Sequence, residues 1–212
     1  MSDFAAQRAH MVEHQLRERG IDDERVLAAM GEVPRETFVG ERRQEMAYAD
    51  AALPIGSEQT ISQPWIVAAI LQALELKGGE RVLEIGTGSG YSTCLLARLT
   101  DHVVSVERHA GLARSAAEHL RACRAQNVEL MVGDGSRGVP GRAPFDAIAV
   151  HAAAPKPPPA LLEQLAEGGR MVVPVVTGKE EMLTAIRRRG TELESIALSP
   201  CRFVPLIGAE GF

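Results

Sequence analysis

The sequence predicts an α/β domain with a seven-stranded, mainly parallel sheet, and three observations support this. After residue 80, short apolar segments alternate with segments of helical periodicity, which is the pattern of a parallel sheet with right-handed crossovers. The apolar segment 81–85 leads directly into a glycine-rich turn and then a helix. Segments 182–187 and 193–197 are expected to form an antiparallel pair that closes one sheet edge.

Length and composition predict a single domain over residues 1–212. The chain is 45% hydrophobic and 24% charged, as in ordinary globular proteins. We expect a helical N-terminal segment over 1–76 and the sheet over 77–212. The net charge of −5 argues against a nucleic-acid-binding surface. The sequence predicts neither a membrane span nor a secretory signal, because no long apolar run is present.

The cysteine and histidine patterns predict no metal site. Cys94, Cys123 and Cys201 are widely separated and form no metal-binding spacing. The six histidines lack the spacings typical of zinc ligands. We therefore expect free thiols and a cytoplasmic protein.

The N-terminal third is predicted to be helical. Apolar residues recur at helical spacing over 4–19, and Gly20 ends this helix. Asp22 or Asp23 can cap a second helix that runs through Met30. Residues 41–59 have no periodic pattern and are expected to be irregular. A third helix begins at Pro64, since the first helical turn tolerates proline.

The sheet elements follow in order. Strands are expected at 81–85, 102–107, 127–132, 145–150 and 171–176, and helices at 91–99 and 109–125. A further helix is expected to follow the stiff Pro155–Pro159 loop, run through Leu165 and end at Gly168-Gly169.

The glycine-rich turn is the first functional motif. Gly86, Gly88 and Gly90 allow the backbone to approach a ligand closely, and the next helix offers unpaired N–H groups. A dinucleotide site spaces its glycines G-x-G-x-x-G, whereas here the third glycine comes one residue early. Glu84 stands two positions before the first glycine. This pattern favours the first motif of Rossmann-like methyltransferases that use S-adenosylmethionine; another nucleotide site and a purely structural turn are the alternatives.

Two further acidic residues end predicted strands. Glu107 lies about 20 residues after the first glycine, where a carboxylate accepts hydrogen bonds from ribose hydroxyls. The alternative is a solvated carboxylate at the strand end. Asp134, before Gly135, suits either the exocyclic amine of adenine or an Asx-type turn, and the sequence leaves both open.

The segment Gln59–Pro64 is the second functional motif. Thr60 or Ser62 could cap the helix that Pro64 opens. Alternatively, a small hydroxyl is held on a rigid turn that faces the glycine-rich turn. Composition alone does not decide between these two interpretations.

Nine segments in order resemble one family, the protein-L-isoaspartate (D-aspartate) O-methyltransferases, from about residue 8 to residue 207. They are Met11–Leu16, Val33–Val39, Tyr48–Ile55, Gln59–Pro64, Val82–Tyr91, Gly133–Gly135, Ala152–Pro155, Gly168–Arg170 and Arg202–Leu206. The T-I-S-Q-P and R-F-V-P-L segments are the most specific.

The resemblance implies a Rossmann-like S-adenosylmethionine-dependent methyltransferase fold with an N-terminal helical extension. It implies that residues 1–76 lie on the substrate side and that the sheet over 77–212 binds the cofactor. It also implies transfer of the methyl group to the free α-carboxylate of L-isoaspartyl and D-aspartyl residues in damaged peptides and proteins, which begins their repair and leaves S-adenosyl-L-homocysteine. A carboxylate has an ordinary pKa near 4, so this nucleophile needs no general base. The lack of a Ser-His-Asp or Cys-His constellation agrees with that chemistry.

The resemblance also implies residue roles. The catalytic residue is Ser62, and the substrate-binding residues are Ile55, Thr60, Val204, Pro205 and Leu206. The cofactor-binding residues are Glu84, Gly86, Thr87, Gly88, Gly90, Glu107, Asp134 and Gly135. The expected partners are isoaspartyl-containing peptides and proteins, without nucleic acid or membrane, and the expected state is a monomer. His151 departs from the family pattern, where a small or hydroxyl residue is expected.

Two alternative functions remain. A carboxyl methyltransferase of the same fold could act on a dedicated peptide or small acid. A nucleotide-binding regulator or dehydrogenase is disfavoured by the glycine spacing and by the presence of both Ser62 and the glycines.

Overall fold

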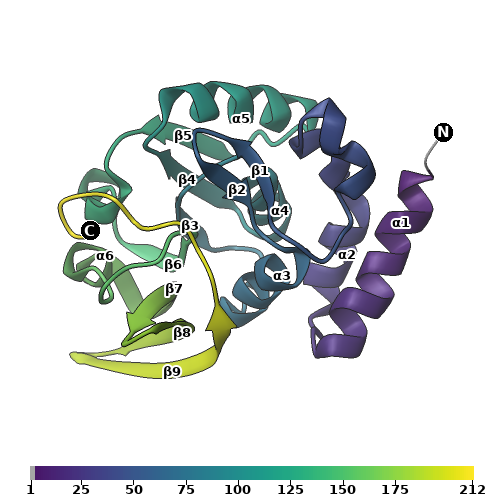
Figure 1. The fold of residues 1–212 in the computed structure, drawn as a ribbon. Helices are drawn as coiled ribbons and strands as arrows, with labels where there is room; N and C mark the ends of the chain where they lie inside the picture. Colours follow the sequence, from purple (N-terminus) through teal and green to yellow (C-terminus); the bar gives the residue numbers. More distant parts are fainter. Residues whose placement is uncertain (1–2) are drawn as a thin grey trace.

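The computed structural model describes residues 3–212, and a seven-stranded sheet is its centre (Figure 1). The strand order is β5-β4-β3-β6-β7-β8-β9. The strands are β3 (Arg81–Ile85), β4 (His102–Glu107), β5 (Val128–Val132), β6 (Phe145–Val150), β7 (Leu165–Thr177), β8 (Glu180–Arg189) and β9 (Glu192–Cys201). The predicted α/β fold with a mainly parallel sheet is confirmed.

The order in which successive strands are added to the sheet reverses beside β3. Successive crossovers lead from β3 outward to β4 and β5, and the chain then returns to place β6 on the other side of β3. Strands β3 to β7 are parallel, whereas β8 is antiparallel to both of its neighbours. In such sheets, ligands bind at the carboxyl ends of the strands beside this switch in order.

Helices cover both faces of the sheet. Alternate strand residues face opposite sides, so that Val82 and Val103 belong to one apolar cluster and Leu83 and Val104 to the other. The first cluster includes residues of α2 (Glu24–Glu32), α3 (Pro64–Ala73), α4 (Tyr91–Leu99) and α5 (Ala110–Ala122). The second includes Leu161 of α6 (Pro159–Glu163), a helix that packs near the short 3-10 turn Gly135–Arg137. No helix within residues 3–212 has both the length and the hydropathy to cross a membrane.

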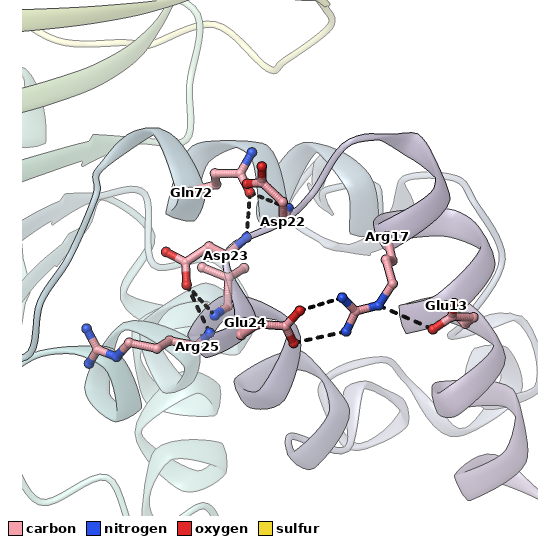
Figure 2. Close-up of polar contacts among 8 residues, drawn as sticks. Glu13, Arg17, Asp22, Asp23, Glu24, Arg25 and Gln72 are labelled. Carbon is pink, nitrogen blue, oxygen red and sulfur yellow. Dashed lines mark hydrogen bonds and ion pairs between the residues drawn. The ribbon is translucent and has the colours of Figure 1, made fainter.

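The first predicted helix is a continuous helical segment in which three types of helix follow one another. It consists of α1 (Phe4–His10), a π-helical stretch (Met11–Leu16) and a 3-10 turn (Arg17–Arg19), and it ends as predicted at Gly20, whose φ is +91°. Polar contacts then join the next helix to the body (Figure 2). The Asp23 carboxylate caps α2, and the Gln72 side chain of α3 accepts hydrogen bonds from the Asp22 and Asp23 N–H groups.

The prediction that residues 41–59 are irregular is wrong. Two 3-10 segments, Arg35–Phe38 and Glu41–Met46, precede a small hairpin of β1 (Leu53–Gly56) and β2 (Gln59–Ile61). Its turn places Ser57 and Glu58 at φ of +49° and +59°. Hairpin turns of this kind are normally signalled by asparagine or glycine, and neither stands at these two positions.

The predicted helix through Leu165 is also wrong beyond Glu163. Strand β7 begins at Leu165, which pairs with Phe145, and the register shifts before Arg170 pairs with Ala147. Gly168 has φ of +73°, and a Cβ on Gly169 would lie 3.0 Å from the Asp146 carbonyl oxygen. The two glycines therefore form a bulge within the strand and do not end a helix.

Candidate active site

A cavity lies at the carboxyl ends of β3, β4 and β6, at the predicted switch in strand order. Its volume is about 800 Å³ with open solvent included. It is lined by Gln59, Thr60, Ile61, Ser62, Val67, Ile85, Gly86, Thr87, Gly88, Ser89, Tyr91, Ser92, Val106, Glu107, Arg108, Gly135, His151, Ala152, Val204, Pro205, Leu206 and Ile207. The two predicted motifs, which are separate in sequence, thus meet in one cavity.

Gly88 is held in a backbone conformation that favours glycine, with little space for a side chain. Its φ is +55°, and a Cβ there would lie 3.3 Å from Cδ1 of Ile55 in the β1–β2 hairpin. Ile55 itself covers this glycine but is not among the lining residues. Gly90 has a different role, because a Cβ on it would meet Ala116 of α5 instead of the cavity. The predicted glycines therefore divide into two that line the cavity, Gly86 and Gly88, and one that packs helices together.

Glu107 ends β4 at the cavity and is almost completely buried. Its Oε2 accepts a hydrogen bond from the Gly88 N–H at 2.8 Å, and its Oε1 accepts one from the His109 N–H at 2.9 Å. The two backbone groups fix the carboxylate beside the glycine-rich turn. This geometry excludes the alternative of a solvated carboxylate at the strand end.

Glu84 lies behind the cavity, not on its surface. It is 0% exposed, and its Oε2 accepts hydrogen bonds from Thr93 (2.5 Å) and Ser105 (2.6 Å). Its Oε1 has no hydrogen bond, but Nε2 of His151 lies 3.3 Å away. His151 and Ser92 line the cavity, so Glu84 is one side chain removed from it.

Asp134 forms the Asx-type turn that the sequence had left open. Its Oδ1 accepts hydrogen bonds from the backbone and hydroxyl of Ser136, and its Oδ2 accepts one from the Ala209 N–H. The carboxylate thus holds the C-terminal tail, and Asp134 does not line the cavity, whereas Gly135 does. These hydrogen bonds keep the pKa of Asp134 below its usual value, although its partial burial acts in the opposite direction.

The Gln59–Pro64 segment contributes two hydroxyls to the cavity. The N-cap of α3 is Gln63, and no side chain caps this helix, so the interpretation of Thr60 or Ser62 as a cap is wrong. The Ser62 hydroxyl makes no hydrogen bond to any part of the chain that the structure describes. Val204, Pro205 and Leu206 also line the cavity, and hydrogen bonds that Val204 and Leu206 exchange with Ala153 hold this segment in place.

Several lining residues were not predicted from the sequence. His151 was noted only as a departure, yet its Nε2 lies 3.0 Å from the Ser92 hydroxyl within the cavity wall. Tyr91 and Arg108 directly follow the predicted motif residues Gly90 and Glu107. That adjacency is the one signal that could have indicated them. Among residues 3–212, no group of three or more His, Cys, Asp or Glu side chains is placed to hold a metal ion.

The residues at this cavity fit S-adenosylmethionine. A buried carboxylate ends the second strand, and the adjoining turn approaches the cavity with backbone alone at Gly88. The sheet carries an antiparallel strand, β8, between β7 and β9. Fold and cavity together define the class as an S-adenosylmethionine-dependent methyltransferase.

Comparisons with known proteins specify the family. The family model described as Protein-L-isoaspartate(D-aspartate) O-methyltransferase (PCMT) matches residues 6–211. A protein-L-isoaspartate O-methyltransferase of Koribacter versatilis is 50% identical over 100% of this chain and 96% of its own length. One of Geotalea uraniireducens is 51% identical, covering 100% of this chain and 98% of its own length.

Similar solved structures indicate the same family. A protein-L-isoaspartate O-methyltransferase is similar with a TM-score of 0.86 and 29% identity, covering 96% of this chain and 67% of that one. A Plasmodium falciparum protein of the same description, in complex with S-adenosyl-L-homocysteine, has a TM-score of 0.84 and 26% identity, covering 98% and 99%. The chain belongs to the protein-L-isoaspartate (D-aspartate) O-methyltransferase family.

Proposed function

We propose that this enzyme methylates the free α-carboxylate of L-isoaspartyl and D-aspartyl residues in damaged peptides and proteins, with Ser62 holding one carboxylate oxygen. The observation that carries the proposal is that Ser62 lines the same cavity as Gly86 and Gly88, although more than twenty residues separate them in sequence. The full-length match to the family supports the same activity.

The methyl donor is S-adenosyl-L-methionine, whose sulfonium supplies an electrophilic methyl group when it is bound. Gly86, Thr87 and Gly88 offer a close backbone surface, and Glu107 offers carboxylate oxygens for hydroxyl groups. Gly135, which follows β5, also lines the cavity. We assign a supporting role to Glu84, which ties β3 to β4 and α4 through Ser105 and Thr93.

The chemistry requires placement more than proton transfer. The substrate carboxylate is already ionised at neutral pH, because its ordinary pKa is near 4. The Ser62 hydroxyl, which has no partner in the described chain, is available to donate a hydrogen bond to it. Orientation and partial removal of water then lower the barrier. We therefore expect no general base and an activity that stays high between about pH 6 and 8.

The substrate peptide is proposed to lie between the Gln59–Ser62 segment and the wall formed by Val204, Pro205 and Leu206. Among these lining residues Thr60 and Pro205 are exposed, whereas Leu206 is buried. Apolar walls with few charged groups suit peptides of diverse sequence, which are recognised through their backbone. We further propose a single-domain, cytoplasmic monomer that binds neither nucleic acid nor membranes.

Tritiated methyl transfer to a short isoaspartyl peptide, beside the same peptide with a normal aspartyl residue, tests this function. We expect labelling of the isoaspartyl peptide alone, and similar rates for isoaspartyl peptides with different flanking residues. Labelling that is confined to one sequence or to a small organic acid would instead indicate the dedicated-substrate alternative. Equal labelling of both twins would overturn the proposal.

A further inference from the structure

Arg35 is a completely buried arginine directly behind the Ser62 turn. Its side chain is 0% exposed, in the 3-10 segment Arg35–Phe38. Nε donates a 2.7 Å hydrogen bond to the Ala47 carbonyl, and Nη2 donates one of 2.7 Å to the carbonyl of Ser62. The guanidinium carbon lies 5.0 Å from the centre of the Tyr91 ring. One side chain therefore joins three segments, two of which line the cavity.

The positive charge of Arg35 has no acidic partner. No carboxylate within residues 3–212 lies within 4.0 Å of its nitrogens. Nη1 is buried and makes no hydrogen bond. The titratable groups that face it are Tyr91 and Tyr48. Burial raises the pKa of both phenols, that of Tyr91 to about 12, so both are neutral at physiological pH.

A buried cation of this kind is unfavourable unless something compensates it. Burial lowers the pKa of Arg35, but an arginine starts so far above neutrality that it stays charged. Within the protein, two carbonyl oxygens and one aromatic face partly compensate the charge. Ser62 and Tyr91, which both contact Arg35, line the cavity.

We propose that Arg35 is a positioning residue for the methylation reaction and that its charge favours an anionic substrate in the cavity. This inference rests on the proposed function, because the anion it favours is the substrate carboxylate. Through the Ser62 carbonyl, Arg35 fixes the peptide plane that follows Ser62 and so the direction of the serine hydroxyl. Through the low-dielectric wall, its charge attracts a carboxylate that it does not touch.

The two parts of the proposal predict different kinetic effects. Arg35→Lys keeps the charge but cannot reproduce the planar fork that reaches two carbonyl groups. It should lower kcat at least five-fold and leave the affinity for the peptide within about three-fold. Arg35→Met removes both features. It should lower kcat/KM for an isoaspartyl peptide at least thirty-fold and weaken peptide binding at least ten-fold.

Arg25→Met is the control for the loss of an arginine that joins backbone segments, at a position that is more exposed than Arg35. Arg25 also donates to two backbone carbonyls, those of Leu76 (2.7 Å) and Leu99 (2.9 Å), but it does not line or adjoin the cavity. Its loss should lower the melting temperature and leave kcat/KM unchanged. For every variant, calorimetry should give the affinity for S-adenosyl-L-homocysteine, and then the affinity for the isoaspartyl peptide with that product saturating.

The result we expect is unchanged cofactor affinity in all variants, with the peptide and rate effects confined to position 35. We expect Arg25→Met to be destabilised and to keep its kcat/KM. If Arg35→Met behaves in the same way, with wild-type kcat/KM, the proposal is overturned. Arg35→Lys with wild-type kcat would overturn the positioning part of the proposal. This test holds even if Arg35→Met does not fold. If wild-type enzyme fails to methylate the peptide, the proposed function fails with it; if only the position-35 effects are missing, this inference alone fails.

Discussion

The backbone N–H of Gly88 donates a 2.8 Å hydrogen bond to Oε2 of Glu107, which joins the turn after β3 to the end of β4. A second N–H, from His109, holds the other carboxylate oxygen. The carboxylate is thus oriented by backbone alone beside the cavity. A side chain fixed in this way is available to bind hydroxyl groups without losing conformational freedom on binding.

Glu107→Ala should therefore weaken binding of S-adenosyl-L-homocysteine by about 1.5–3 kcal/mol, the scale of hydrogen bonds to a charged group. Titration calorimetry at neutral pH measures this directly. Glu129→Ala is a suitable control, because Glu129 pairs with Arg142 at the surface of the neighbouring strand β5. Equal affinities of the two variants would show that Glu107 does not bind the cofactor.

Gly88→Val should abolish cofactor binding, because a branched side chain would occupy the space between the turn and Ile55. The change also introduces backbone strain at a φ of +55°. Gly190→Val in the β8–β9 turn has similar strain at +61° but open space around it. That control should lose stability and keep its affinity for S-adenosyl-L-homocysteine. If both variants bind the product normally, the glycine-rich turn is not the cofactor surface.

Asp134 should make attachment of the C-terminal tail dependent on pH. Its pKa in the folded protein is below the unfolded value, so folding favours the ionised form. The stabilisation is present at neutral pH and is lost as the pH falls through the folded pKa, below about 4. The protection factor of the Ala209 amide, which corrects the exchange rate for its intrinsic pH dependence, should fall over that range. In Asp134→Asn, exchange should already be faster at pH 7, and the acid-dependent step should be absent; an unchanged step would contradict this account.

The sequence was sufficient for the central strands of the sheet because their signals are local. Strands β3, β4 and β6 are apolar runs whose predicted ends match the structure, and Gly86 marks the end of β3. The cavity followed from topology, since carboxyl ends of neighbouring parallel strands meet at one sheet edge.

Other features depend on tertiary contacts that no local pattern shows. The β1–β2 turn uses Ser57 and Glu58 in a conformation that neither residue favours. The Gly168-Gly169 pair is equally common at helix ends, and only pairing with β6 makes it a bulge. One partner of Asp134, the Ala209 N–H, comes from a tail 75 residues further along the chain. The role of Arg35 depends on where its guanidinium lies, which motif recognition cannot supply.

The most direct test is the single-turnover rate of methyl transfer to an isoaspartyl peptide by Ser62→Ala, with the methyl donor saturating. Because the Ser62 hydroxyl caps no helix and has no partner in the described chain, its removal should barely change the melting temperature. Ser195→Ala, at an exposed position of β9, is the control. We expect the rate of Ser62→Ala to fall about 10²–10³-fold, as for the loss of an orienting donor in other enzymes. A Ser62→Ala enzyme that transfers the methyl group at the wild-type rate would contradict the account.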